Sequence, residues 1–294
     1  MANFSGKLNT IAQDTDSYLK SVFSKQNSKS HLIKPMKYGV FSGGKRFRSA
    51  IVVNTGKIFG IDYKKLIIIG AAVECLHSYS LMHDDLPSMD NDDLRRGRPS
   101  THKKFNEFTA ILAGNSLLTL AFEILSGSDL KISQKIKAEL IRALSNCSGH
   151  SGLAGGQYSD LTFENKNISK KNIINMQKKK TGELFGFCCE SIAIINEENI
   201  KKRKLLREIG LQIGLLFQIV DDLIDYKGDS RIVGKPTKSD KKKGKATLVN
   251  LLGYSETLNF AKTLKKKLDQ QIKKYGIKAN DLLESIEFIL TREF

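Results

Sequence analysis

Residues 66–90 read LIIIGAAVECLHSYSLMHDDLPSMD. An apolar stretch long enough for several helical turns ends there in a cluster of carboxylates. A second stretch, FQIVDDLID at residues 217–225, ends in the same way. Carboxylates beside buried apolar surface are costly unless something neutralises them. The two stretches therefore predict two helices whose aspartates line one site.

The composition favours an all-α protein. The chain has 294 residues, 40% of them hydrophobic, with four prolines and no tryptophan. Segments rich in leucine, isoleucine, alanine, lysine and glutamate dominate, and nothing marks a domain boundary. We expect one domain over residues 1–294, built as an antiparallel helical bundle. The expected helices cover roughly residues 5–26, 45–59, 63–85, 105–126, 130–150, 169–197, 201–227, 245–273 and 279–291.

The net charge of +17 raises the question of an anionic partner. The excess is mostly lysine without interleaved aromatic residues, and no zinc-finger, RRM or KH signature is present. A solvated, lysine-rich surface explains the excess, so a nucleic-acid binder is the least favoured class of protein. Salt-sensitive retention on DNA or RNA would identify such a binder.

Neither membrane insertion nor disulfide bonding is expected. The first residues, MANFSGK, lack the hydrophobic core of a signal peptide. The longest apolar stretches, at residues 66–76 and 185–195, are interrupted by Glu74 and Glu190, which argues against membrane spans. The four cysteines show no CxxC spacing, so we expect reduced, buried thiols in a cytoplasmic protein.

Helical spacing groups the acidic residues further. His77 and Asp84 lie seven positions apart and therefore share a helix face. The second stretch places four polar residues at positions i, i+3, i+4 and i+7, namely Gln218, Asp221, Asp222 and Asp225. A capped acidic loop would account for one or two aspartates near Asp84, but five like charges within residues 84–93 repel unless cations lie among them. Hard divalent cations, which prefer oxygen ligands and bridge to phosphate, fit this pattern.

Basic residues lie beside these motifs. GGKRFR at residues 43–48 predicts a tight turn into a helix N-terminus, where backbone N–H groups and the helix dipole favour an anion. Lys45 and Arg48, at i and i+3, are placed to bind one phosphate group. RR at residues 95–96 follows the first aspartate cluster, and KKKTG at residues 178–182 adds cations and a hydroxyl group. Together with the lack of a serine or cysteine nucleophile motif, this pattern suggests a diphosphate substrate ionised with the help of metals.

Some of these basic residues also have ordinary interpretations. Lys178 and Lys179 have an ordinary interpretation as surface lysines. Arg95 has an ordinary interpretation in an intrachain salt bridge to Asp92 or Asp93. The second acidic stretch, taken alone, is explained as well by a solvated helix end as by a set of metal ligands, and the first cluster is what favours the ligands.

The motifs as a set resemble those of the trans-isoprenyl diphosphate synthases, from residue 43 to about residue 247. The landmarks in chain order are GGKRFR at 43–48, ECLHSYS at 74–80, HDDLPSMD at 83–90, DDLRRG at 92–97, GGQYSD at 155–160, KTG at 180–182 and FQIVDDLID at 217–225. The resemblance implies an all-α fold of the isoprenoid synthase type with a central cavity. It also implies a prenyltransferase that condenses isopentenyl diphosphate with dimethylallyl and geranyl diphosphate to farnesyl diphosphate, as in bacterial farnesyl-forming members.

Carried over position by position, the resemblance implies a role for each motif residue. Magnesium, expected as three ions with manganese as a substitute, would be bound by Asp84, Asp85, Asp90, Asp221 and Asp225. The diphosphate of isopentenyl diphosphate would be bound by Gly44, Lys45, Arg48, His77 and Arg96. The allylic diphosphate would be bound by Arg95, Lys180, Thr181, Gln218 and Lys235. The residues expected to act on the developing allylic cation are Lys180, Thr181 and Gln218. A homodimer is implied by the resemblance alone.

Product length is expected to depend on Tyr79 and Ser80. Tyr79 lies five positions before Asp84, about 7.5 Å further down the helix axis, where a growing hydrocarbon tail would meet its ring. The spacer at residues 86–89 between the aspartates also resembles the farnesyl type. A geranylgeranyl or longer product is the alternative within the enzyme class. A non-catalytic synthase subunit is the alternative of another class, but it would be expected to lack one acidic motif, and both are intact.

Two further features bear on the resemblance. Ser49 stands where many relatives have a proline, which would suit the first turn of a helix although the chemistry does not require it. The lysine-rich stretch from Gly228 to Lys245 directly follows the second acidic motif. We expect it to act as a lid that excludes water from the site.

Overall fold

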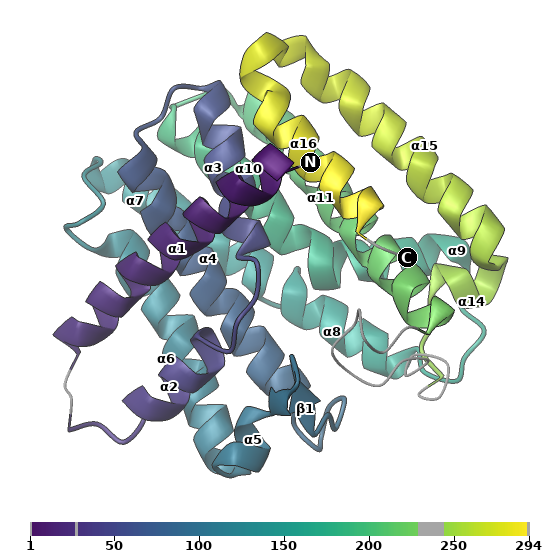
Figure 1. The fold of residues 1–294 in the computed structure, drawn as a ribbon, viewed down its shortest axis with the longest axis horizontal. Coiled ribbons are helices and arrows are strands. Elements are labelled where there is room, and N and C mark those ends of the chain that lie inside the picture. Colours follow the sequence, from purple (N-terminus) through teal and green to yellow (C-terminus); the bar gives the residue numbers. More distant parts are fainter. Residues whose placement is uncertain (1, 27–28, 229–243, 293–294) are drawn as a thin grey trace. The chain divides into compact units, whose positions relative to one another are not determined.

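The computed structural model describes residues 2–26, 29–228 and 244–292, and these residues are almost entirely helical. The all-α prediction is therefore confirmed. The strands in the described part of the chain are a short antiparallel hairpin of β1 (Leu94–Arg95) and β2 (Arg98–Pro99). The chain forms two compact units, which we describe separately; Figure 1 shows their elements.

The first unit comprises residues 1–53 and 61–141. Its elements are α1 (Ala2–Lys25), α2 (Ile33–Val40), the start of α3 (Phe47–Ile58), α4 (Tyr63–Asp84), the hairpin, α5 (Thr101–Lys104), α6 (Glu107–Ser126) and the start of α7 (Gln134–Ser148). Helix α4 is the centre of this unit, because it packs against α1, α2 and α6. Almost every residue from Leu66 to Met82 is buried. A helix that is apolar on all sides is stable only when it is surrounded in this way.

The second unit comprises residues 54–60 and 142–294. Its described elements are the end of α3, the end of α7, α8 (Leu153–Thr162), α9 (Lys170–Gln177), the π-helical turn η1 (Lys178–Gly182), α10 (Glu183–Ile195), α11 (Ile200–Lys227), α14 (Leu248–Leu252), α15 (Tyr254–Ile272), the 3₁₀ turn η2 (Lys273–Ala279) and α16 (Asn280–Thr291). Helix α11 packs against α10, α15 and α16. Its approach to α10 requires a glycine, since a Cβ atom at Gly210 would lie 2.2 Å from the carbonyl oxygen of Phe185. The centre of this unit is thus the helix that carries the second aspartate motif.

Most of the expected helices are present, with boundaries shifted by a few residues. Three described α-helices were missed, the short α2 and α5 and the glycine-containing α8. The prediction of one continuous helix over residues 245–273 was wrong, because Gly253, with φ of 80°, separates α14 from α15. The helix expected over residues 169–197 is a continuous helical path, but its middle widens into the π-helical turn η1.

Two further sequence expectations concern the apolar residues. All four cysteines are buried and free, as predicted. By length and composition alone, two helices of the described part of the chain are apolar enough to cross a membrane, α4 and α6. The apolar window of α4 is 78% buried and that of α6 is 44% buried. The high burial of α4 is that of a core helix within the first unit.

Candidate active site: polar groups of the two units

The glycine turn before α3 has the backbone that its sequence predicts. Gly43 and Gly44 have φ angles of 93° and 115°, and Arg46 has φ of 48°. Glycine adopts such angles without steric cost, whereas a residue with a Cβ atom adopts them only when other contacts hold it there. The contacts of Arg46 are therefore the key to this turn.

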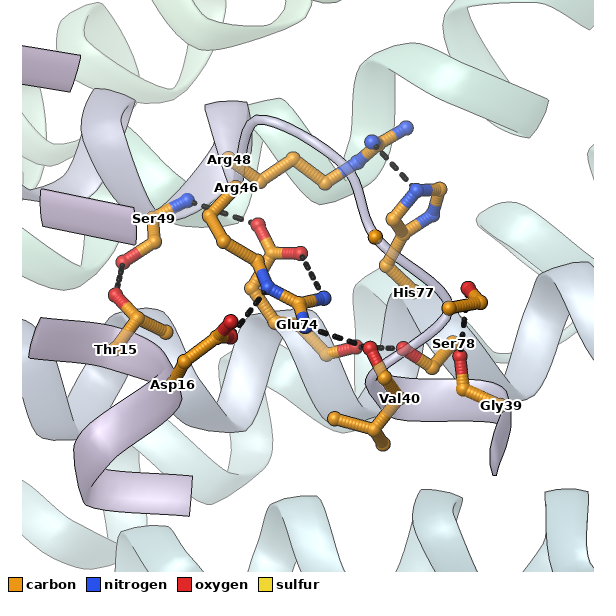
Figure 2. Close-up of polar contacts among 12 residues, drawn as sticks. Thr15, Asp16, Gly39, Val40, Arg46, Arg48, Ser49, Glu74, His77 and Ser78 are labelled. Carbon is orange, nitrogen blue, oxygen red and sulfur yellow. Dashed lines mark hydrogen bonds and ion pairs between the residues drawn. The ribbon is translucent and has the colours of Figure 1, made fainter. Parts of the chain in front are cut away.

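Arg46 is a buried arginine bound by three helices of the first unit (Figure 2). Its Nε donates to Asp16 Oδ1 on α1 at 2.8 Å, and its Nη2 donates to the carbonyl oxygen of Val40 on α2 at 2.6 Å. Its Nη1 lies 3.7 Å from Glu74 Oε2 on α4, and both side chains of this ion pair are 3% exposed. A buried charge is tolerated only when it is paired and hydrogen-bonded, so these contacts hold the turn in place.

Glu74 also explains the unusual Ser49. The backbone N–H of Ser49 donates to Glu74 Oε1 at 3.2 Å, and its hydroxyl lies 2.7 Å from the hydroxyl of Thr15 on α1. A proline at position 49 has no N–H group and could not make the first of these bonds. The serine therefore adds one donor to a buried carboxylate and one link to α1.

Arg48 is oriented by His77. Arg48 Nη1 lies 3.0 Å from His77 Nε2, as Figure 2 shows. Burial lowers the pKa of His77 well below its ordinary value, and the neighbouring guanidinium groups lower it further, those of Arg48, Arg96, Arg46 and Arg95. The imidazole is therefore neutral, and its Nε2 accepts the hydrogen bond from Arg48. Four arginines near a neutral histidine concentrate positive charge in this part of the unit.

Arg96 joins this group from the hairpin. Arg96 and Gly97 form its two-residue turn with φ angles of 52° and 72°, as hairpins of this length require. The Arg96 guanidinium donates to the carbonyl oxygen of Gly43 and lies against Gly44. A Cβ atom at position 44 would lie 2.6 Å from the guanidinium carbon. The first unit thus brings together four predicted diphosphate-binding residues, Gly44, Arg48, His77 and Arg96, while Lys45 is exposed on the same turn.

The first aspartate motif divides into residues with different surroundings. Asp84 is the last residue of α4, whereas Asp85 is buried and accepts a hydrogen bond from Arg95 Nε at 2.9 Å. Burial raises the pKa of Asp85, although Arg95 opposes this shift. Arg95 also lies 3.6 Å from Asp92, so the salt bridge considered from the sequence is present. Among the described residues, no three carboxylate, histidine or cysteine side chains converge as a metal site.

In the second unit, two lysines share one buried carboxylate. Lys180 and Lys245 donate to Asp160 Oδ2 at 2.7 and 2.9 Å, and Lys245 also pairs with Glu164 at 2.8 Å. Burial alone would raise the pKa of Asp160, but the two ammonium groups outweigh it and the pKa is lowered. Sequence reasoning missed Lys245 and Asp160. Lys245 ends a lysine-rich run that offers no signal to distinguish it, whereas Asp160 was visible in the GGQYSD landmark.

Thr181 and Gln218, the other predicted catalytic residues, contact each other. The Thr181 hydroxyl on η1 donates to Gln218 Oε1 on α11 at 2.7 Å. Gln157 on α8, another residue without an expected role, is buried, and its amide has no hydrogen-bond partner within residues 2–26, 29–228 and 244–292. Gln157 belongs to the same GGQYSD landmark as Asp160, and that motif is the sequence feature that singles it out.

In the second aspartate motif, Asp221 forms an ion pair with an arginine side chain. Arg292, just beyond α16, places Nη1 2.8 Å from Asp221 Oδ1. The same guanidinium lies 4.0 Å from the centre of the Phe217 ring and donates to the carbonyl oxygen of Phe217. Asp225, one turn further along α11, is buried. Lys235 and most of the expected lid lie outside the described residues.

Comparison with known proteins identifies the family. The family model named Polyprenyl synthetase matches residues 29–285. The chain belongs to this family. It is 38% identical over 266 residues to the farnesyl diphosphate synthase of Escherichia coli (strain K12), a match that covers 89% of both chains. The resemblance inferred from the motifs is therefore confirmed, and with it the prediction of a prenyltransferase.

Solved structures support the same family assignment. An FPP/GFPP synthase from Zymomonas mobilis matches with a TM-score of 0.86 and 36% identity, over 98% of this chain and 99% of that chain. A geranyltransferase from Helicobacter pylori, complexed with magnesium and isoprenyl diphosphate, matches with a TM-score of 0.81 and 31% identity, over 97% and 96% of the two chains.

In this polyprenyl synthetase, the expected chain-length residues lie on the central helix of the first unit. The Tyr79 ring makes an edge contact with His83, with ring centres 4.7 Å apart. Ser80 is buried, and its hydroxyl donates to the carbonyl oxygen of His77 at 2.9 Å. Tyr79 is thus the bulky member of the pair, and Ser80 is occupied by a local backbone contact.

Replacing Arg46 with methionine should destabilise this polyprenyl synthetase by about 3–5 kcal/mol, because Glu74 is left buried without its cation. Adding Glu74→Leu should recover part of the loss. Urea denaturation followed by circular dichroism measures both effects. The matched control is Lys57→Met, since Lys57 forms a partly exposed pair with Asp281 and its replacement should cost less than about 1 kcal/mol. Equal losses for Arg46→Met and Lys57→Met would contradict the structural role given to Arg46.

Replacing His77 with glutamine should weaken the pH dependence of stability on the acid side. His77 stays neutral in the folded protein, while in the unfolded chain it takes up a proton as the pH falls through its ordinary value of 6.5. Folding stability therefore falls below that pH, by at most about 1.4 kcal/mol per pH unit for one such group. Melting temperatures between about pH 7.5 and 5.5, on either side of that ordinary pKa, measure the slope. An unchanged slope in His77→Gln would show that folding does not lower the pKa of His77.

Proposed function

We propose that this polyprenyl synthetase joins isopentenyl diphosphate to dimethylallyl and geranyl diphosphate, forms farnesyl diphosphate and works as one catalytic domain over residues 1–294. The observation that carries this proposal is the group of guanidinium ions around the neutral His77. Guanidinium groups bind phosphate oxygens through paired hydrogen bonds, so a group of them beside the glycine turn suits a diphosphate. The farnesyl product is supported by the name and similarity of the relative from Escherichia coli.

The residues near the glycine turn would bind isopentenyl diphosphate. Lys45, Arg48 and Arg96 supply the cations, and Gly44 leaves room for the Arg96 guanidinium. His77 would keep Arg48 in position as a neutral hydrogen-bond acceptor and would add no charge of its own. Because the imidazole is neutral, the arginines supply the positive charge, and binding should not depend on imidazole protonation.

The allylic diphosphate would be bound by cationic side chains. Arg95, Lys180 and Lys235 are the residues proposed for this role from the resemblance. Lys245 is a further candidate, because its ammonium group shares the Asp160 carboxylate with Lys180. Asp160 would then keep both ammonium groups charged and close together until the diphosphate arrives.

Magnesium is the proposed cofactor, with three ions expected. Its ligands would be the carboxylates of Asp84, Asp85, Asp90, Asp221 and Asp225. This all-oxygen donor set suits a hard divalent cation, and the Arg292 guanidinium at Asp221 supports a cation-binding role for that carboxylate. When bound, magnesium would neutralise the negative charge of the departing diphosphate.

Thr181 and Gln218 would stabilise the developing allylic cation through their oxygen atoms. Neither is a nucleophile towards the cation in this proposal, because an amide oxygen and a hydroxyl oxygen act there as fixed dipoles. The double bond of isopentenyl diphosphate then attacks the cation, and the released pyrophosphate is a plausible base for the proton. A longer product is the second candidate, supported by the description of the Zymomonas mobilis neighbour as an FPP/GFPP synthase.

Asp84→Ala and Asp221→Ala should each abolish turnover while keeping the helical fold, since each removes a proposed magnesium ligand. The measurement is the conversion of radiolabelled isopentenyl diphosphate with each allylic primer in magnesium buffer, followed by chromatography of the dephosphorylated products. Asp129→Ala, which removes an exposed carboxylate paired with Lys25, is the matched control. Wild-type turnover by Asp84→Ala would refute the metal assignment.

Tyr79→Ala should lengthen the main product by at least one five-carbon unit, because removing the ring opens the wall that the hydrocarbon tail meets. Ser80→Ala should change the product little, since the serine is too small to block the tail. The same chromatographic assay gives the product lengths. A Tyr79→Ala enzyme that still stops at fifteen carbons would place the floor of the pocket elsewhere.

We also propose that the enzyme is a cytoplasmic homodimer without a nucleic-acid partner or stable membrane insertion. The dimer is supported by an exposed apolar stripe on α6, formed by Phe108, Ile111 and Leu112, which are 66%, 39% and 47% exposed. Their i, i+3, i+4 spacing places them on one face. Contiguous apolar surface of this kind marks interaction sites.

Replacing Phe108 and Leu112 together with serine should convert dimers into monomers, because the stripe loses its two most exposed apolar side chains. Light scattering coupled to size-exclusion chromatography gives the mass. The control is Leu205→Ser, a similarly exposed leucine of the second unit with 46% exposure. A wild-type mass of one chain would refute the homodimer.

A further inference from the structure

Asp222, the middle aspartate of the second motif, is bound by two glutamine amides. It is 3% exposed. Gln218 Nε2, from the same helix, donates to its Oδ1 at 2.8 Å. Gln177 Nε2, from the end of α9, donates to its Oδ2 at 2.6 Å. Both carboxylate oxygens of Asp222 thus accept from side chains of its own unit.

These two bonds determine how the Gln218 amide is oriented. A carboxylate accepts hydrogen bonds but cannot donate them, so each glutamine must turn its NH₂ group towards Asp222. For Gln218, the oxygen then points the other way, where the Thr181 hydroxyl donates to it at 2.7 Å. The chain of contacts from Gln177 to Thr181 therefore has one consistent set of donors and acceptors.

The orientation decides what Thr181 and Gln218 offer to a cation. With its proton directed to Gln218, the Thr181 hydroxyl keeps its lone pairs available on its other side. A Gln218 amide turned by half a rotation would present NH₂ hydrogens beside Thr181, and these carry the wrong charge to stabilise a carbocation. A Gln218 amide held in this orientation therefore stabilises the allylic cation better than a freely rotating one.

Gln177 is suited to hold this arrangement. It is 2% exposed and directly precedes the π-helical turn η1, which carries Thr181. Its own Oε1 has no hydrogen-bond partner within the described parts of the chain. A buried oxygen without a hydrogen-bond partner is destabilising. The hydrogen bond from its NH₂ group to Asp222 offsets this loss.

We propose that Gln177 and Asp222 are positioning residues, which fix the Gln218 amide and, through it, the Thr181 hydroxyl with their oxygens available to the allylic cation. This inference rests on the proposed function. It assigns Asp222 a role inside the protein rather than at a metal ion, and it gives Gln177 a role in the reaction without contact to substrate.

An exchange of donor and acceptor tests the proposal. Gln177→Glu alone places a second carboxylate against Asp222, so the two repel and the arrangement is lost. Adding Asp222→Asn lets the new amide donate to the carboxylate introduced at position 177, while the oxygen of that amide again accepts from Gln218. We expect Gln177→Glu to lower kcat about tenfold or more with little change in KM for isopentenyl diphosphate. The double variant should recover kcat to within about threefold of the wild type.

The kcat values of the single and double variants can support or overturn the proposal. Unchanged kcat in Gln177→Glu, or a double variant no faster than Gln177→Glu, would overturn the proposal. Glu208→Gln is the matched control, because Glu208 accepts from the Gln212 amide at 3.1 Å on the same helix α11. That variant should leave kcat unchanged.

A spectroscopic readout separates this inference from the proposed function. In protein labelled with ¹⁵N-glutamine, without substrate or metal, the side-chain protons of Gln218 should resonate downfield, since their acceptor is charged. Asp222→Leu should remove that shift, and the Gln177→Glu/Asp222→Asn variant should keep the Gln218 amide protected from exchange. An unshifted wild-type resonance would overturn the proposal. A wild-type protein without prenyltransferase turnover would instead refute the function and leave these resonances as a test of the contacts.

Discussion

The hydrogen bonds and ion pairs of the buried Arg46 guanidinium are the interactions on which the glycine turn of the first unit depends. The guanidinium joins Asp16 on α1, the end of α2 and Glu74 on α4, and it lies in the turn that precedes α3. An arginine cannot lose its charge, so burying it requires these partners together. With the turn fixed in this way, Arg48 reaches His77 and Gly44 lies against Arg96.

In both aspartate motifs, the first and second aspartates differ in burial and in hydrogen-bond partners. In each, the second aspartate is buried and bound within its own unit, Asp85 by Arg95 and Asp222 by two glutamines. The first aspartate of each motif, Asp84 or Asp221, is more exposed. Burial explains the division, because a carboxylate in the core must find donors there, whereas a more exposed one can also be solvated or pair near the surface, as Asp221 does with Arg292. The aspartates of each motif are therefore not equivalent in their surroundings.

The sequence predicted the long helices correctly, because their apolar pattern extends over many turns, and missed short ones. The helices α4 and α11 follow from many turns of apolar residues, and their period is visible without any structure. Helix α2 contains a proline and a glycine within eight residues, and α8 contains the pair Gly155 and Gly156, so local propensity argues against both. Packing reverses this preference in α8, since a Cβ atom at Gly156 would lie 2.1 Å from the backbone nitrogen of Lys180.

The amino-acid sequence by itself determined the helical class, the two acidic motifs, the glycine turn and the family. These features depend on spacing along the chain, and the geometry of a helix or a turn is local. Only the tertiary structure decided the partners: Lys245 with Asp160, 85 positions apart, and Gln177 with Asp222, 45 positions apart. Which helices pack together is set by burial of their apolar faces, and polar side chains then bind whatever donors and acceptors that packing brings within reach.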